Sequence, residues 1–142
     1  MNQVNQLLIF GGQHWLLVSL AIILLALIVF YEGRRASGNG VSPQELVRAM
    51  NHDNAVILDL RGRDLYKKGH ILNAEHFPQS TLDHQMNKLE KFKERPIVLV
   101  DADGMQARKV LEKFKKVSIE DVKVLTGGMR AWREASLPLQ KG

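Results

Sequence analysis

Residues 97–106 have the sequence IVLVDADGMQ and decide the predicted fold of the chain. Four aliphatic residues are followed directly by Asp101, Asp103 and Gly104, so a buried strand is expected to end there in a tight loop. Helical spacing begins at Met105, which places the loop between a strand and a helix. Open α/β sheets present their chemistry at this kind of junction. The residue at position 101 therefore decides which chemistry the domain can perform.

Segments with strand character alternate with segments of helical periodicity on both sides of this stretch. Strands are expected at 55–60, 74–77, 97–100 and 121–125, and helices or helical turns at 42–50, 62–68, 81–92, 105–114 and 129–135. This alternation predicts an α/β fold, with an open, mostly parallel sheet and helices on both faces. About 100 residues are enough for one such domain, which we place at 42–142.

The first 31 residues contain no Lys, Arg, Asp or Glu, and residues 15–31 are almost entirely apolar. Apolar side chains occur on every face of this predicted helix, which is not the pattern of an amphipathic surface helix. At about 1.5 Å per residue the segment covers about 25 Å, against a hydrocarbon core of about 30 Å. We therefore predict one N-terminal transmembrane helix within residues 1–32. A buried core helix and a cleaved signal peptide are the alternatives.

The predicted anchor is followed by a Gly- and Ser-containing stretch, residues 33–41, which is expected to be a flexible linker. No basic residue precedes the anchor, whereas Arg34 and Arg35 follow it directly. Positive charge on that side predicts a single-pass protein with its N-terminus outside and its C-terminal domain in the cytoplasm.

The formal net charge is +5, and most lysines lie on predicted amphipathic helices. A solvated helical face and weak attraction to anionic lipid headgroups both account for this charge. No aromatic residues interleave the basic ones, so no nucleic-acid partner is expected. The predicted partners are the lipid bilayer, through residues 15–31, and an unidentified membrane or cytosolic protein.

A series of short motifs, in order along the chain, resembles the rhodanese family. The motifs are ILDLR at 57–61, Tyr66, GHI at 69–71, Ala74, FP at 77–78 and TGGMRAW at 126–132. The resemblance covers residues 42–138, and with its anchor the chain is similar to bacterial membrane-tethered single-domain rhodanese-like proteins of the inner membrane. It implies structural roles for Asp59, Gly69, His70, Pro78, Gly127, Gly128 and Trp132. Within that set, Asp59 is expected to bond nearby backbone groups, His70 to make a structural hydrogen bond, and Trp132 to pack in the core.

The rhodanese resemblance implies a sulfurtransferase mechanism, in which a cysteine at the end of a central strand accepts sulfur from a donor such as thiosulfate. Asp101 stands at the matching position, and the chain contains no Cys. A carboxylate cannot form a persulfide. Gln106 ends the loop where active members often have Arg. The resemblance therefore implies a domain that lacks sulfurtransferase activity, needs no cofactor and serves as a binding or scaffolding module at the cytoplasmic membrane face.

The candidate binding surface is the mouth of the loop, formed by Asp101, Ala102, Asp103, Gly104, Met105 and Gln106 together with Arg61. We expect the Asp101 carboxylate to accept loop N–H groups that would otherwise hold a substrate anion. An ordinary surface-loop aspartate is the alternative. Arg61 is expected to face the loop and to pair with Asp101 or Asp103.

A metal-dependent phosphatase is a second hypothesis for the same loop. Residues 98–104 also resemble the first motif of haloacid-dehalogenase-type phosphatases, in which the first Asp is a nucleophile and the second a general acid. Asp101 and Asp103 would take these roles, with Thr126 after the next strand. No later Lys with paired carboxylates follows, and the histidines lack metal-ligand spacing, so no metal site is predicted. A residual sulfur-related activity and a purely structural role, with the anchor contacting other membrane proteins, also stay open.

Overall fold

The computed structural model describes residues 14–36 and 38–142, with side chains described for 14–31 and 38–142. The chain divides into two compact units between Gly38 and Asn39. Residues 1–13 of the predicted N-terminal segment, and residue 37 of the predicted linker, lie outside the described residues.

Helix α2, Trp15–Ala36, carries exposed apolar side chains along its described length. Leu16, Ile22 and Leu25 are more than 60% exposed, so this helix has no buried packing face within its own unit. In the part of the chain that the structure describes, no helix is both long enough and apolar enough to cross a membrane. The predicted helix is confirmed, whereas the predicted transmembrane anchor is not supported by the structure.

Most of the predicted linker, residues 33–41, has regular structure. Helix α2 extends to Ala36, because Arg and Ala are strong helix formers. Strand β1, Gly40–Val41, pairs with the strand β5, Val122–Leu125. A two-residue strand leaves no period-2 signal in the sequence, and only its pairing with β5 reveals it.

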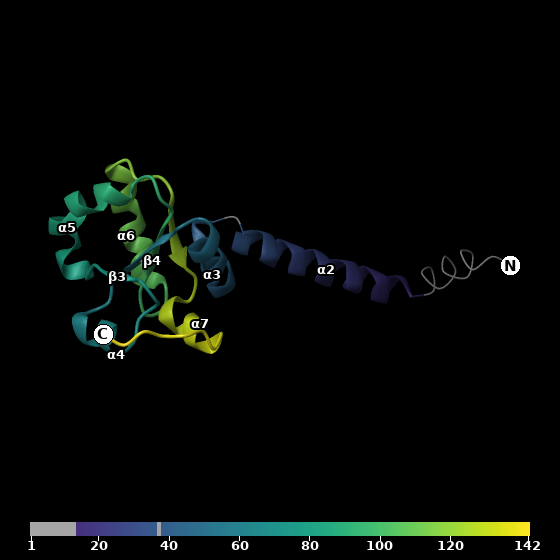
Figure 1. Ribbon diagram of the computed structural model, residues 1–142. Helices are drawn as coiled ribbons and strands as arrows, with labels where there is room; N and C mark the ends of the chain where they lie inside the picture. The colour runs from purple at the N-terminus through teal and green to yellow at the C-terminus, as the bar shows by residue number, and fades with distance from the viewer. Residues whose placement is uncertain (1–13, 37) are drawn as a thin grey trace. The chain divides into compact units, whose positions relative to one another are not determined.

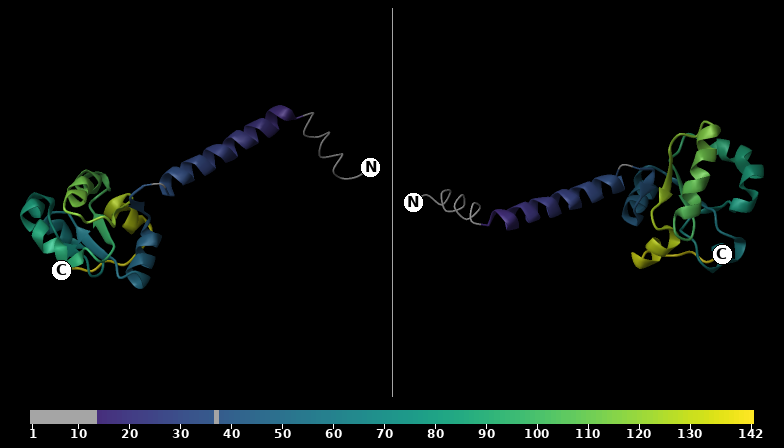
Figure 2. Two further views of the ribbon diagram at one scale, coloured as in Figure 1. Left: turned by 90° about the horizontal axis from the view of Figure 1, so that it is seen from above. Right: turned by 180° about the vertical axis from the view of Figure 1, so that it is seen from behind.

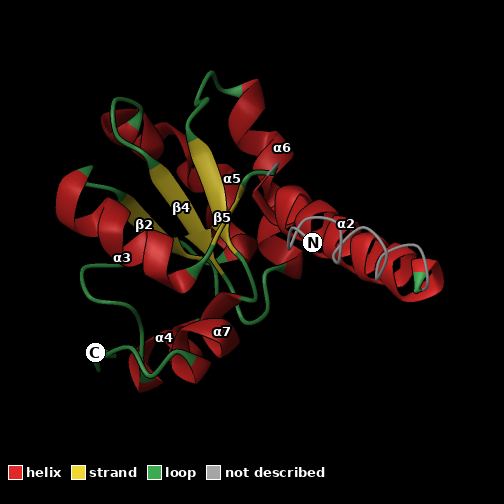
Figure 3. Cartoon of the chain, turned by 90° about the vertical axis from the view of Figure 1, so that its right-hand side faces the viewer, coloured by secondary structure: helices red, strands yellow, loops and turns green. Residues whose placement is uncertain are grey.

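The sheet has five parallel strands in the order β1-β5-β4-β2-β3. Besides β1 and β5, these are β2 (Val56–Asp59), β3 (Glu75–His76) and β4 (Ile97–Val100). Figure 3 shows β2, β4 and β5 side by side at the centre of the domain. In the register of the two central strands, Asp59 lies opposite Val100. The parallel sheet is confirmed, and the carboxyl ends of β2 and β4 lie at one edge.

Helices cover both faces of the sheet, as predicted. They are α3 (Pro43–His52), α4 (Arg63–Lys68), α5 (Leu82–Gln85), α6 (Met105–Lys116) and α7 (Gly128–Glu134). Figure 1 shows α5 and α6 on one side of the sheet and α3 and α7 on the other, and Figure 2 shows the same division. Alternate residues of β4 feed the two cores: Ile97 and Leu99 pack under α6, and Val98 and Val100 under α3 and α7. Because both faces of β4 are buried in this way, every residue of the strand is apolar.

The predicted helix at 81–92 is split into α5 and a 3₁₀ segment, η2, Met86–Phe92; a further 3₁₀ turn, η1, spans Gln79–Thr81. The predicted helical spacing is present, but the segment changes from an α-helix to a 3₁₀ helix for a geometric reason. Met86, Leu89 and Phe92 recur every three residues, which places them on one face of a 3₁₀ helix with three residues per turn.

Candidate functional site

The loop formed by residues 101–106 leaves the carboxyl end of β4 and enters α6. It lies against the glycine turn that follows β5. The N–H of Met129 donates to the carbonyl of Asp101 at 2.8 Å. A Cβ atom at Gly128, whose φ is +56°, would lie 2.5 Å from that same carbonyl oxygen. Only glycine therefore permits this approach, and the predicted structural role of Gly128 is confirmed.

The Asp101 side chain is turned inward and is only 4% exposed. Its Oδ1 accepts a hydrogen bond from the N–H of Gly104, and its Oδ2 accepts from the N–H groups of Gln106 (2.8 Å) and Ala107 (3.2 Å). One carboxylate thus satisfies three N–H groups of the loop and of the first turn of α6, where N–H groups lack intrahelical partners. The expectation that Asp101 fills the cradle is confirmed, and the surface-loop alternative is wrong.

Asp103 also caps the start of α6, with a side chain that lies on the surface. Its Oδ1 accepts the N–H of Met105 at 3.0 Å, and its side chain is exposed. Gly104, directly after Asp103, adopts φ +90°, in the left-handed region that favours glycine. The sequence DADG is therefore a capping device for α6, in which two carboxylates hold four N–H groups.

Arg61 does not pair with the loop, so that prediction is wrong. Its Nε and Nη2 donate to both carboxylate oxygens of Asp59, with a shortest distance of 2.7 Å, and Nη2 also donates to the carbonyl of Gly69 at 2.8 Å. The N–H of Arg61 donates to Asp59 Oδ1 at 3.0 Å, which confirms the predicted backbone bond of that carboxylate. Both side chains are buried. The planar guanidinium fits a carboxylate two residues away in a two-pronged geometry, and this short link prevails over the loop.

An aromatic stack lies beside Arg61, and its His76 Nε2 is 2.9 Å from the Arg61 carbonyl. Tyr66 lies between His70 (centroid distance 3.8 Å) and His76 (4.6 Å), and its hydroxyl donates to the carbonyl of Ala74 at 2.6 Å. His70 Nδ1 lies 2.8 Å from the Tyr66 carbonyl, so its predicted structural hydrogen bond is confirmed. Burial raises the pKa of Tyr66, with smaller contributions from the charges of Asp59 and Glu75. No periodic pattern along the chain indicates this stack.

The predicted core role of Trp132 is confirmed, since the residue is 2% exposed and its Nε1–H donates to the carbonyl of Pro138 at 3.0 Å. Pro78 precedes η1, and Gly127 has φ +77° at the start of α7. These residues shape the turns around the site and contribute no polar group to it.

A recess of about 300 Å³ opens at the mouth of the loop. Its lining contains Arg61, five of the six predicted loop residues and three further residues. The lining residues are Leu60, Arg61, Leu65, Gln79, Asp101, Ala102, Asp103, Met105 and Gln106. Gly104 is buried beneath it. Sequence reasoning missed Leu65 and Gln79, because they reach the recess from α4 and η1. The mouth predicted from the loop therefore exists as a concave surface.

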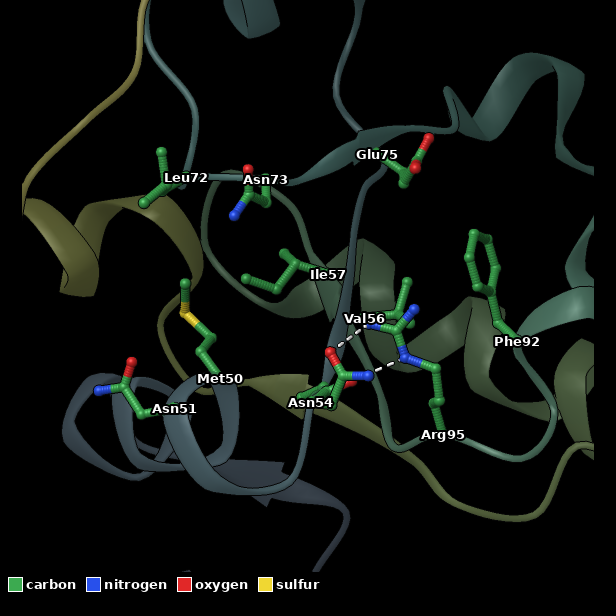
Figure 4. Close-up of a pocket in the computed structure, with 11 residues that line it drawn as sticks. Met50, Asn51, Asn54, Val56, Ile57, Leu72, Asn73, Glu75, Phe92 and Arg95 are labelled. Carbon is green, nitrogen blue, oxygen red and sulfur yellow. Dashed lines mark hydrogen bonds between the residues drawn. The ribbon is translucent and has the colours of Figure 1, made fainter.

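A different cavity, of about 390 Å³, lies at the amino ends of β2 and β4 and is shown in Figure 4. There Arg95 donates from Nε to the carbonyl of Asn54 (2.8 Å) and from Nη2 to its Oδ1 (2.9 Å). Ligands of open α/β sheets bind beyond the carboxyl ends of the strands, so the loop recess is the better candidate. In the described part of the chain, no group of three or more His, Asp or Glu side chains could hold a metal ion.

The structure lends no support to the phosphatase hypothesis. Asp101, its proposed nucleophile, is buried with both carboxylate oxygens bonded to the N–H groups of its own loop. A nucleophile must present a free oxygen toward the substrate.

Comparisons with known proteins agree with this geometry. The rhodanese-like domain family matches residues 42–135. The uncharacterized protein YibN of Escherichia coli (strain K12) is 29% identical over 142 residues, covering 98% of this chain and 99% of that protein. The thiosulfate sulfurtransferase GlpE of Pseudoalteromonas translucida (strain TAC 125) is 28% identical over 95 residues, covering 67% of this chain and 89% of its own length.

Solved structures show the same fold. A rhodanese-like domain from Anabaena is 27% identical with a TM-score of 0.65, over 74% of this chain and 80% of that one. A rhodanese-related protein from Thermoplasma volcanium, at 19% identity, gives a TM-score of 0.66 over 72% of this chain and 98% of that one. The second likeness concerns the fold alone.

Proposed function

The chain belongs to the rhodanese-like domain family, and we propose that it is a non-catalytic member that works as a membrane-tethered protein-binding module. The observation that carries the proposal is the Asp101 carboxylate, which holds three N–H groups of the loop at the position where the family resemblance implies a cysteine.

Sulfur transfer from thiosulfate needs a nucleophile that this chain lacks. A thiolate attacks the outer sulfur of thiosulfate, the S–S bond of thiosulfate breaks, sulfite leaves, and a persulfide remains on the protein. The chain contains no Cys, and a carboxylate cannot form that persulfide. The N–H groups of Gly104, Gln106 and Ala107, which would face an anion in this cradle, are already bonded to Asp101.

A binding role is supported by what the loop mouth retains. The loop is ordered by its own carboxylates, and two large apolar side chains beside it are exposed, Leu65 by 46% and Met105 by 64%. Exposed apolar groups next to a concave polar surface are typical of interaction sites. We propose that this surface docks a partner protein.

The membrane tether is proposed from helix α2. Its described side chains from Trp15 to Tyr31 are almost all apolar and exposed, with the aromatic residues at the two ends, as in interfacial belts. The similarity to YibN extends over 98% of the chain and therefore includes this segment. Arg34 and Arg35 follow the apolar stretch in the sequence, which favours a domain on the cytoplasmic side of a bacterial inner membrane. Carbonate extraction of cell membranes tests the tether, and release of the chain into the soluble fraction would contradict it.

The catalytic part is tested by sulfur transfer from thiosulfate to cyanide, with the full chain and with Asp101→Cys. We expect no turnover from the natural chain. Asp101→Cys places a thiol among the N–H groups of the cradle and is expected to gain one sulfur atom from thiosulfate, detected by mass spectrometry. Ala102→Cys is the matched control, with an exposed thiol one residue further on. Turnover by the natural chain that is lost in Asp101→Ala would refute the proposal.

A further inference from the structure

The backbone N–H groups at the start of α6 and two of the Arg61 donors beside the recess are already engaged. Four N–H groups at the start of α6 are bonded to Asp101 or Asp103. The Arg61 Nε and Nη2 donors are bonded to Asp59 and Gly69. An anion that used these donors would have to displace one of these bonds, each of which is charge-assisted or buried. The recess is therefore poorly suited to the anionic ligand that its fold would lead one to expect.

The charges that remain in the recess are negative. The guanidinium of Arg61 is neutralised by Asp59, which leaves the carboxylates of Asp101 and Asp103. The positive end of the α6 dipole, about half an elementary charge, offsets only part of these two charges. Asp103 is exposed and uses one oxygen for Met105, so its other oxygen can accept a hydrogen bond from outside. A cationic donor fits this position.

The walls and size of the recess favour a single amphipathic side chain. Leu65 and Met105 line it and are exposed, so they can cover an apolar stem. Its volume of about 300 Å³ lies at the lower limit for small-molecule pockets. Lys and Arg side chains combine a long apolar stem with a charged end. The apolar groups at the rim extend the contact beyond one side chain, as a docked protein would require and a free amine would not.

We infer that the recess selects a lysine or arginine side chain of a partner protein, with the charged end at Asp103 and the stem against Met105 and Leu65. The inference rests on the proposed binding function and names the partner's chemistry. It reverses the charge preference of an anion-binding cradle on the same fold, because the chain supplies the anion from within.

The experiment follows the Met105 methyl group by NMR in the full chain, labelled at its methionine methyls and held in zwitterionic nanodiscs. The probes are the tripeptides Ac-Ala-Lys-Ala-NH2, Ac-Ala-Gln-Ala-NH2 and Ac-Ala-Glu-Ala-NH2, and thiosulfate. We expect a saturable shift of Met105 with the lysine peptide, while Met50 and Met86, outside the recess, stay unmoved. The glutamine peptide is expected to bind about three- to fivefold more weakly, the scale of an exposed ion pair, and the glutamate peptide more weakly still. Added salt reduces the difference.

Asp103→Asn is the decisive variant, because its side chain is exposed and its loss leaves the buried loop bonds in place. It should abolish the preference for lysine over glutamine. Asp121→Asn, an exposed aspartate before β5 and outside the recess, is the matched control and should retain that preference. Equal or tighter binding of thiosulfate or the glutamate peptide, no saturable Met105 shift with the lysine peptide, or an unchanged lysine preference in Asp103→Asn, would overturn the inference. Sulfur turnover with lysine selectivity intact would overturn only the proposed function.

Discussion

Two buried carboxylates, Asp59 and Asp101, stand at the carboxyl ends of neighbouring strands and are satisfied in different ways. Asp59 is 1% exposed and is held by the guanidinium of Arg61, whereas Asp101 is 4% exposed and is held by backbone N–H groups alone. The first pairing neutralises a charge with a side chain. The second fills an anion site with a group from the same chain. The difference shows that one fold can satisfy a buried carboxylate either with a side-chain cation or with backbone N–H groups alone.

The comparison is tested most strongly by removing the side-chain cation. Arg61→Ala leaves Asp59 buried without its counter-charge, and the free energy of unfolding should fall by about 3–5 kcal/mol, measured by urea denaturation. Arg95→Ala removes a more exposed arginine that is bonded to Asn54. This change should lower the free energy of unfolding by about 1 kcal/mol. Equal losses in the two variants would show that the Asp59 pair is no stronger than a surface contact.

Removing the second carboxylate should have a smaller effect on stability and a distinct effect on binding. Asp101→Ala leaves three N–H groups without their acceptor and should lower the free energy of unfolding by about 2 kcal/mol. The emptied cradle should then accept an external anion, so thiosulfate should raise the unfolding midpoint of Asp101→Ala and leave that of the natural chain unchanged. Asp103→Ala is the control, and a thiosulfate response in it would show that the anion binds elsewhere.

The pKa of Tyr66 depends in part on the charge of Asp59. Burial first, and then the charges of Asp59 and Glu75, raise its pKa above the ordinary 10.0. A raised pKa means that the folded state favours the neutral phenol, so this contribution to stability is complete below pH 10 and is lost as the pH rises through the folded-state pKa. Tyr66→Phe also removes the bond to Ala74, and should cost about 1 kcal/mol at neutral pH.

The measurement is urea denaturation of both chains at neutral pH and above pH 10. The stability gap between the natural chain and Tyr66→Phe should narrow on the alkaline side. A gap that is constant with pH would mean that Tyr66 ionises as it does in the unfolded chain.

The smallest effect on stability is expected from replacing Glu45, an exposed carboxylate that also accepts a hydrogen bond from a backbone N–H. It forms a capping box with Ser42 at the start of α3, and the Ser42 hydrogen bonds lower its pKa below 4.5, with smaller contributions from Arg48 and Lys123. A lowered pKa gives stability that is present above pH 4.5 and is lost as the pH falls through the folded-state pKa.

Glu45→Gln should therefore flatten the acid limb of the stability curve, with a loss below about 1 kcal/mol at neutral pH because solvent screens the group. Acid titration of unfolding midpoints measures this change. The same acid limb in Glu45→Gln as in the natural chain would show that Glu45 does not cause it.

The order of strands and helices followed from local patterns. The run at 97–100 is apolar at every position because both faces of β4 are covered, and Ser42 with Glu45 forms the capping box that starts α3. The split between α5 and η2 was missed, although the three-residue spacing of Met86, Leu89 and Phe92 was present in the sequence. Strand β1 carried no local signal, since two residues are too few for a period.

In the candidate site, too, some features could be predicted from the sequence and others could not. The loop residues and the role of Asp101 were predictable, because a carboxylate three to six residues before free N–H groups at a helix start can reach them locally. The partner of Arg61 could not be predicted, because Asp59 and the loop were both within plausible reach of its side chain. Leu65 and Gln79 were missed because they enter the recess from segments distant in sequence.

The sequence by itself determined that this chain holds no thiol and that a carboxylate follows its central strand, since composition and local order are written in it directly. Only the tertiary structure decided that Asp59 takes Arg61 away from the loop and that α4 and η1 close a recess beside it. Those outcomes depend on competition between contacts that are far apart along the chain, and local periodicity carries no information about which contact has the lower free energy.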